Sequence, residues 1–212
     1  MIYAIGNDSK RKKATPAGVG TCPHCSSVMV PKCGDINIWH WAHKSTKGCD
    51  AWRESETDWH RQWKSIVPSE RAEVTISNFG QRHRADIITS KGVVVELQHS
   101  AISTADIAER EAFYGDMIWV FDISDCLQKR WIGNYGGVDY FDNRFQLHNK
   151  GNYYTFRWKH PRKHIAYTTK PTFLDFGDIN IFRLRRMYPD APCGGWGNLL
   201  RRYKFIERLK AA

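Results

Sequence analysis

Hydrophobic residues recur at helical spacing shortly after the first quarter of the chain. Between residues 53 and 66, Trp59, Trp63 and Ile66 follow one another at steps of four and three, and Pro68 comes just after them. This spacing predicts one buried stripe of an α-helix that ends before the proline.

Three segments rich in β-branched residues come next and are typical of strands. They span residues 73–76, 83–89 and 93–98. Ser90-Lys-Gly92 separates the last two and predicts a three-residue hairpin loop. Residues 103–114 start with the cap pattern Ser-Thr-Ala-Asp and predict a second helix, and the apolar run 117–121 predicts a buried strand reached by a helical crossover. The order helix, three strands, helix, strand describes a compact α/β core of mixed α+β type.

The hairpin loop sets the register of its two strands. If Thr89 pairs with Val93, Asp86 faces Glu96, with the two Cβ atoms about 5 Å apart on one face of the sheet. Both strands are apolar, so the two acids are expected to be buried and to need a cation, and hard divalent cations prefer oxygen ligands. The pattern favours metal-assisted phosphate chemistry, and a structural ion pair with Arg84 is the alternative.

A polar stripe accompanies the apolar one on the first predicted helix. Glu56, His60 and Lys64 are spaced by four residues, so a carboxylate, an imidazole and an ammonium are expected to point the same way. Glu56 is therefore a candidate third carboxylate beside Asp86 and Glu96. The alternative is that Glu56 is only a helical partner of His60 on a solvated face.

Cysteine and histidine concentrate in residues 21–50. The candidate metal ligands there are Cys22, Cys25, Cys33, His40, His43 and Cys49. Zinc takes four such ligands tetrahedrally, and a CxxC pair followed by a second pair is the pattern of a structural site. The expected set is Cys22, Cys25, His43 and Cys49, with His40 as a substitute for His43 and Cys33 left over. Free thiols or a redox CxxC are the alternative, although no βαβ pattern surrounds the pair.

Charge and aromatic rings are unevenly distributed along the chain. Residues 127–212 carry 17 Lys and Arg against 6 Asp and Glu, whereas residues 1–126 carry 15 against 16. The last 86 residues also hold 17 of the 28 aromatic side chains. Basic groups interleaved with rings suit phosphate neutralisation and base stacking, so DNA contact is expected here. The alternative is a basic surface over an aromatic core.

The composition excludes several classes of protein. No segment approaches the roughly 20 apolar residues that a membrane helix needs, and no signal peptide is recognised, so we expect a cytoplasmic protein without a membrane partner. Because the cytosol keeps thiols reduced, the six cysteines are expected to be metal ligands or buried thiols.

Several motifs resemble those of one nuclease family. Asp86 followed by Glu96-Leu-Gln98 resembles the PD-(D/E)xK signature, with Gln98 in place of the lysine. The other matching motifs are His40-Trp-Ala-His43, Glu56-Thr-Asp-Trp-His60, Arg84-Ala-Asp86 and Glu96-Leu-Gln98-His-Ser100. In this order, over residues 20–125, they resemble the CoiA-like competence-protein nuclease family.

This resemblance implies a restriction-endonuclease-like fold and hydrolysis of DNA phosphodiester bonds with Mg²⁺ or Mn²⁺, on branched or single-stranded recombination intermediates. The residues expected to be catalytic are Glu56, His60, Lys64, Asp86, Glu96 and Gln98. Glu56, Asp86 and Glu96 would hold the catalytic metal, and zinc would be structural. Gln98 can orient water but carries no charge, so Lys64 or His60 is expected to supply it. DNA is the expected partner, with a second copy of the chain as a further candidate.

The same reasoning divides the chain into four parts. We expect a basic lead-in arm at 1–20, an N-terminal zinc-ribbon-like module at 21–50, the PD-(D/E)xK nuclease core at 51–126 and a basic, aromatic-rich C-terminal extension at 127–212. The competing hypothesis is a catalytically inactive zinc-ribbon DNA-binding protein that acts through its basic tail.

Overall fold

The computed structural model describes residues 1–36, 38–45, 47–52, 54–124, 145–158, 160–190 and 193–211. The chain is of mixed α/β type and divides into two compact units, residues 1–96 and 97–211. The boundary falls inside a strand, so the region 51–126 that we expected to be the nuclease core contributes to both units. No helix within the described ranges is long and apolar enough to cross a membrane.

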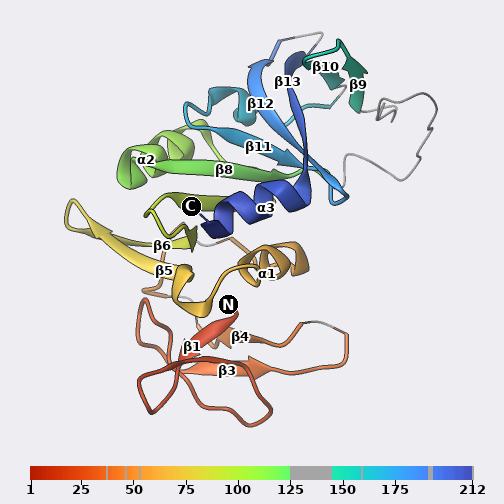
Figure 1. Ribbon diagram of the computed structural model, residues 1–212. Helices are drawn as coiled ribbons and strands as arrows, with labels where there is room; N and C mark the ends of the chain where they lie inside the picture. Colours follow the sequence, from red (N-terminus) through yellow and green to blue (C-terminus); the bar gives the residue numbers. More distant parts are fainter. Residues whose placement is uncertain are drawn as a thin grey trace. The chain divides into compact units, whose positions relative to one another are not determined.

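The first unit contains two small hairpins, one helix and a three-stranded antiparallel arrangement (Figure 1). Its elements are β1 (Tyr3–Ile5), β2 (Arg11–Lys13), β3 (Met29–Lys32), β4 (His40–His43), α1 (Asp58–Lys64), the 3₁₀ turn η1 (Ser69–Arg71), β5 (Ala72–Asn78), β6 (Gln81–Ile88) and β7 (Val94–Gln98). β1 pairs with β2, β3 with β4, and β6 with both β5 and β7, all antiparallel.

The first twenty residues are ordered, in contrast to the irregular lead-in that we expected. β1 and β2 form a hairpin, and Ile5 also exchanges backbone hydrogen bonds of 2.8 Å with Thr21. A small apolar cluster anchors the segment and consists of Met1, Ala4, Ala14, Cys22, Met29 and Trp41. Strands of three residues carry too little periodicity to be recognised in a sequence, which explains the difference.

The first helix is shorter than predicted. α1 begins after Thr57, whose side chain accepts the His60 backbone N–H while the His60 ring accepts the Thr57 backbone N–H, a reciprocal capping box. Glu56 therefore precedes the helix and does not lie on it. Trp63 is fully buried, as its place in the apolar stripe predicted.

The predicted register of the central hairpin is confirmed. Ile88 pairs with Val94, Ile87 pairs with Val95, and the Thr89 backbone N–H donates to the Val93 carbonyl at 2.9 Å. The strands lie within a residue or two of their predicted limits. When this register is continued by one residue, Asp86 lies opposite Glu96 of β7. Glu96 is 3% exposed.

The second unit holds two α-helices and the remaining described strands. Its elements are α2 (Thr104–Tyr114), β8 (Met117–Asp122), β9 (Phe145–Asn149), β10 (Tyr154–Trp158), the 3₁₀ turn η3 (Lys163–Tyr167), β11 (Thr172–Asp175), β12 (Asn180–Tyr188), β13 (Gly194–Arg201) and α3 (Arg202–Ala211). The predicted second helix and its following strand are confirmed as α2 and β8, and Ser103 caps α2 by accepting the Asp106 N–H at 3.0 Å.

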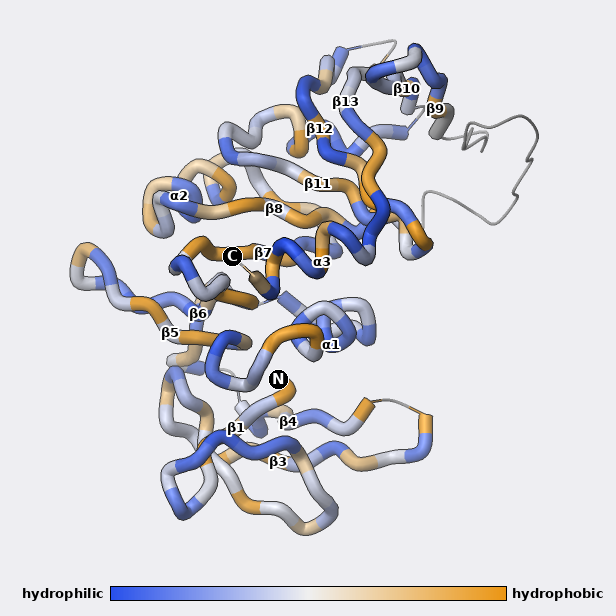
Figure 2. The backbone as a smooth tube through the Cα atoms, viewed as in Figure 1, coloured by the Kyte–Doolittle hydropathy of each residue, from blue (hydrophilic) through white to orange (hydrophobic). Residues whose placement is uncertain are grey.

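The strands of the second unit are hydrogen-bonded in the order β8-β11-β12-β13-β10-β9. β8 and β11 are parallel, and the other neighbouring pairs are antiparallel. The core of the unit consists of fully buried apolar side chains, among them Trp119, Phe121, Leu174, Ile181 and Phe182. Figure 2 shows the contrast between a hydrophobic β8 and a β12 that is hydrophilic over much of its length.

The C-terminal region is more regular than its sequence pattern suggested. The sequence also predicts a terminal basic helix near residues 199–209, and this helix is confirmed as α3, which starts at Arg202 because β13 continues to Arg201. The sequence also predicts a turn at Tyr135-Gly-Gly137, which lies outside the described residues.

Candidate functional site

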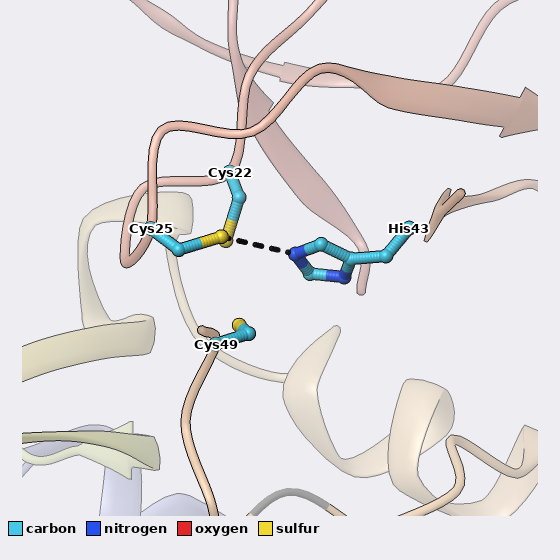
Figure 3. A group of neighbouring side chains, drawn as sticks. All are labelled: Cys22, Cys25, His43 and Cys49. Carbon is cyan, nitrogen blue, oxygen red and sulfur yellow. Dashed lines mark hydrogen bonds between the residues drawn. The ribbon is translucent and has the colours of Figure 1, made fainter. Parts of the chain in front are cut away.

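Four side chains of the first unit converge beside the β3–β4 hairpin (Figure 3). Cys22 and Cys25 lie on the loop before β3, His43 ends β4, and Cys49 follows in the next loop. Their ligand atoms all lie within 4.8 Å of one another, and Cys25 Sγ is 3.4 Å from His43 Nε2. Three thiols and one imidazole in this arrangement can hold zinc tetrahedrally. The predicted ligand set is thus the set that comes together.

Backbone hydrogen bonds stabilise the loop between the first two cysteines. The Ser26 N–H donates to the Cys22 carbonyl at 2.9 Å, and the Cys22 N–H donates to the Ser27 carbonyl at 2.8 Å. The His24 N–H donates to Cys22 Sγ at 3.4 Å. These bonds fix the loop that carries both thiols of the CxxC pair, and the two thiols point toward the same place.

The two remaining candidate ligands have other surroundings. His40 Nδ1 is 2.9 Å from the Ile38 carbonyl, and Cys33 packs against the small apolar cluster around Trp41. Neither belongs to the group of four. The sequence left His40 and His43 as alternative ligands. The structure favours His43, because only His43 of the two lies with the three cysteines.

The surroundings of this group shift the pKa values of two of its thiols in opposite directions. Burial raises the pKa of the Cys49 thiol to about 12, and the neighbouring Cys22 adds to the effect. At Cys25 burial acts in the same direction, but hydrogen bonds involving Ser27 outweigh it and lower the pKa. A divalent ion deprotonates a coordinating thiol outright, so bound zinc would offset the cost of burying thiolates here.

A second polar cluster in the first unit surrounds one buried ammonium group. Lys64, 2% exposed, ends α1. Its Nζ lies 2.9 Å from Asp86 Oδ1, 3.0 Å from Glu56 Oε1 and 3.4 Å from Glu73 Oε1. We call these four residues the Lys64 cluster. It unites three residues that the sequence singled out with one that it did not.

Glu73 is the member that sequence reasoning missed. It is fully buried and has a φ of +53°, a backbone conformation that is uncommon for residues other than glycine. Its carboxylate accepts the backbone N–H groups of Ile2 and Tyr3 at 3.0 and 3.1 Å. No periodicity could have marked it, because its position depends on this local backbone irregularity.

The charges of the Lys64 cluster perturb one another strongly. Burial alone lowers the pKa of Lys64, but Asp86, Glu56 and Glu73 together raise it above its ordinary value. Burial raises the pKa of Glu56, and the nearby Lys64 ammonium overcomes this and holds it well below its usual range. Arg84 is partly buried, and the charges of the same three carboxylates raise its pKa against the effect of burial. Lys64 and Glu56 are therefore both charged at neutral pH.

His60 has a different environment from the one expected. Its Nε2 lies 3.1 Å from Glu54 Oε2, and its Nδ1 lies 2.8 Å from Thr57 Oγ1. The ring is 3% exposed and belongs to the cap of α1. These contacts give His60 a part in starting the helix that ends at Lys64.

The two other predicted residues, Glu96 and Gln98, lie on β7 and are each 3% exposed. Gln98 Nε2 donates to the Ser100 carbonyl at 3.1 Å. Carboxylates are the ligands that Mg²⁺ prefers, so the donor chemistry of Glu56, Asp86 and Glu96 fits this ion. Among the described residues, however, these three do not gather their oxygens as the cysteine and histidine group gathers its atoms. The cation that contacts both Glu56 and Asp86 is the Lys64 ammonium.

A histidine and aspartate pair in the second unit was also missed by sequence reasoning. His99 Nδ1 lies 2.8 Å from Asp122 Oδ2, and Asp122 is buried at the end of β8. Arg162 donates to the backbone carbonyls of both residues. The pairing joins positions 23 residues apart in sequence, so no local pattern could have shown it.

One comparison with known proteins bears on identity. Residues 11–51 match the family model of the N-terminal domain of competence protein CoiA. This segment contains all four residues of the candidate zinc group. No curated protein and no solved structure matches the chain. The match supports a CoiA-like competence-protein family.

Proposed function

We propose that this chain, with its CoiA-type N-terminal segment, is a competence-related nuclease that hydrolyses DNA phosphodiester bonds with Mg²⁺ or Mn²⁺. The observation that carries the proposal is the Lys64 cluster. Three carboxylates and a lysine meet in a buried position beside a β-hairpin. The order α1, β5, β6, β7, α2, β8 is compatible with a restriction-endonuclease-like core.

Asp86, Glu96 and Glu56 are the residues that would hold the catalytic ion. A bound Mg²⁺ polarises the scissile phosphate and lowers the pKa of a bound water. The protein contributes the position of the carboxylates, since β6 and β7 share a fixed register and Glu56 is held by Lys64 at 3.0 Å. Glu73 is tied to two backbone N–H groups, so we assign it a supporting role rather than a metal-binding one.

Lys64 would supply the positive charge that Gln98 cannot. Its raised pKa keeps it protonated at neutral pH, so it stabilises negative charge on a phosphate and does not act as a general base. This places the lysine of the nuclease signature on α1 instead of β7. His60 acts indirectly in this proposal, because it caps the helix that presents Lys64.

The zinc group would have a structural role in the first unit. It joins the loop before β3, the end of β4 and the loop leading toward α1. Metal bound there would add to the stability that the small apolar cluster around Trp41 provides, because so small a segment buries little hydrophobic surface by itself.

A second candidate function is a non-catalytic DNA-binding protein with a zinc ribbon. Its support is that the Lys64 ammonium contacts both Glu56 and Asp86, as in a purely structural ion-pair network. The two functions differ in whether a divalent ion turns over DNA.

Incubation of the purified protein with single-stranded, duplex, flapped and four-way DNA in Mg²⁺ or Mn²⁺ separates them. Cleavage of at least one substrate, absent when Ca²⁺ replaces Mg²⁺, is the expected result. DNA binding with no cleavage of any substrate under these conditions would favour the binding protein.

A further inference from the structure

One face of the sheet in the second unit presents arginines and aromatic rings together. In the pairing of β12 with β13, Arg183 lies opposite Asn198 and Arg186 lies opposite Trp196. Directly opposed residues share a face, and the bulge after Leu184 keeps these two pairs on the same side. The exposed fractions of 38% for Trp196 and 48% for Tyr188 show that this side is open.

The opposite face of the same strands is the packed one. An added Cβ at Gly197 would lie 2.7 Å from the Phe182 ring, and one at Gly195 would lie 2.9 Å from the Phe156 ring. Phe156 and Phe182 are 2% and 0% exposed and contact each other edge to face at 5.7 Å. The side that carries Arg183 is covered by α3 near Phe173, whose ring packs against Phe205. Around Arg186 and Trp196 the same side is polar and exposed, so this part is available for a partner.

The rings on the polar side are grouped. Tyr153 packs against Trp196 in an edge-to-face contact with centroids 5.9 Å apart, and Tyr153 is 41% exposed. The Arg186 guanidinium lies over the Tyr188 ring at 5.2 Å. Rings that stay exposed beside a guanidinium, instead of turning into the core, are the features of a stacking platform.

The arginines beside these rings repel one another. Burial lowers the pKa of Arg183, and the charges of Arg185 and Arg208 lower it further, so three cations lie close together. Arg185 donates to Asn198 Oδ1 at 3.0 Å, a neutral partner. In the part of the chain that the structure describes, none of the three forms a salt bridge with a carboxylate. An anion bound here would relieve this repulsion.

We propose that this face, defined by Tyr153, Arg183, Arg185, Arg186, Trp196 and Arg208, binds single-stranded DNA. Phosphates contact the arginines, and bases stack on Trp196 and Tyr153. The exposed rings favour single-stranded over duplex DNA, because the bases of a duplex are already stacked on one another and their faces cannot reach the rings. The choice of DNA rests on the proposed function.

Fluorescence anisotropy with a labelled oligothymidylate of about 20 nucleotides, long enough for one binding face, tests this without added Mg²⁺ or Mn²⁺. Trp196→Ala should weaken binding by about 5- to 150-fold, the cost of losing one stacked base. The double variant Arg183→Gln/Arg185→Gln should lower the slope of log affinity against log salt by about 1.4, the value for two phosphate contacts with a single strand.

Two matched controls lie on the other side of the sheet. Lys163 and Tyr167 are exposed and belong to η3, whose His164 packs against Phe121 at 5.9 Å. Through Leu174, Phe121 shares the face of Phe182 and not that of Arg183. Tyr167→Ala and Lys163→Gln should therefore leave the affinity within about twofold of the wild type, a difference below 0.5 kcal/mol.

An oligonucleotide with abasic sites separates stacking from charge. Trp196→Ala should leave its binding unchanged, while the arginine variant should still weaken it. An equal loss from Trp196→Ala and Tyr167→Ala on oligothymidylate would overturn the proposal, as would duplex DNA or single-stranded RNA binding tighter than single-stranded DNA. The binding assay contains no catalytic ion, so it is independent of cleavage. A protein that binds in this way but cleaves no DNA in the separate Mg²⁺ or Mn²⁺ assay would refute the proposed function and retain this inference.

Discussion

Lys64 Nζ lies 2.9 Å from Asp86 Oδ1, and both groups are largely withdrawn from water. The lysine ends α1 and the aspartate belongs to β6, so this ion pair ties the helix to the strand that carries the proposed metal ligand. With Glu56 and Glu73 on the same ammonium, the pair is the centre of the polar network in the first unit.

Replacement of the lysine should destabilise the fold. Lys64→Met leaves three buried carboxylates without their shared counter-ion, which costs about 3–5 kcal/mol when one partner of a buried pair is removed. Urea denaturation followed by tryptophan fluorescence measures the change. The exposed Lys91→Met serves as the control and should alter the free energy of unfolding by less than about 0.5 kcal/mol. Equal values for the two variants would show that the cluster contributes nothing to the fold.

The acid stability of the protein should depend on Glu56. Because Lys64 holds its pKa below the ordinary value of 4.5, the folded state binds the proton more weakly than the unfolded state. This carboxylate therefore stabilises the fold above pH 4.5, and the stabilisation is lost as the pH falls below that value. Glu56→Gln removes the titration, so its melting temperature should fall less steeply with acid than that of the wild type. The exposed Glu109→Gln should retain the wild-type slope, and a Glu56→Gln curve parallel to both would contradict the assignment.

Zinc content should follow the four convergent residues. The purified wild type should carry about one zinc per chain, as a Cys₃His site holds one ion. Cys49→Ser should lose the metal and melt at a lower temperature, whereas Cys33→Ser, outside the group, should keep it. Elemental analysis with thermal unfolding provides both readouts. Retention of zinc by Cys49→Ser together with its loss from Cys33→Ser would show that a different set of ligands is used.

A methyl group added to β13 at Gly197 should destabilise the second unit. An added Cβ at Gly197 would lie 2.2 Å from the Arg183 carbonyl oxygen, a backbone atom that cannot move aside alone. Gly197→Ala should lower the free energy of unfolding by at least about 1–3 kcal/mol, the typical cost of overpacking a core. Gly34→Ala has open space around it and should change stability little. Matching denaturation midpoints for the two variants would contradict the strand pairing described here.

Local patterns predicted the parts of the fold that local chemistry determines. The loop Ser90-Lys-Gly92 was enough to set the register of β6 and β7, because a hairpin loop fixes which residues face each other. The spacing of the cysteines and histidines predicted the candidate zinc group, but the structure was needed to favour His43 over His40.

Features that depend on distant contacts could not be predicted in this way. Glu73 joins the Lys64 cluster through a backbone irregularity and through N–H groups some 70 residues away in sequence. The pairings of β10 with β13 and of β8 with β11 join segments that are far apart in sequence. Gly195 and Gly197 are sites where phenylalanine rings approach the sheet, which no local pattern shows. Glu56 meets Lys64 although the helix starts after it, because the chain before the cap turns back toward the cluster.

The proposed nuclease activity is tested most directly by single-turnover cleavage with Asp86→Asn. The substitution keeps the shape of the side chain but removes one charge from the proposed metal site beside Lys64. The exposed Asp116→Asn is the matched control. On whichever DNA the wild type cleaves in Mg²⁺, Asp86→Asn should be slower by at least about 100-fold, the usual cost of losing a catalytic electrostatic group, and Asp116→Asn should equal the wild type. Equal cleavage rates for all three proteins would contradict the assignment of the active site to the Lys64 cluster.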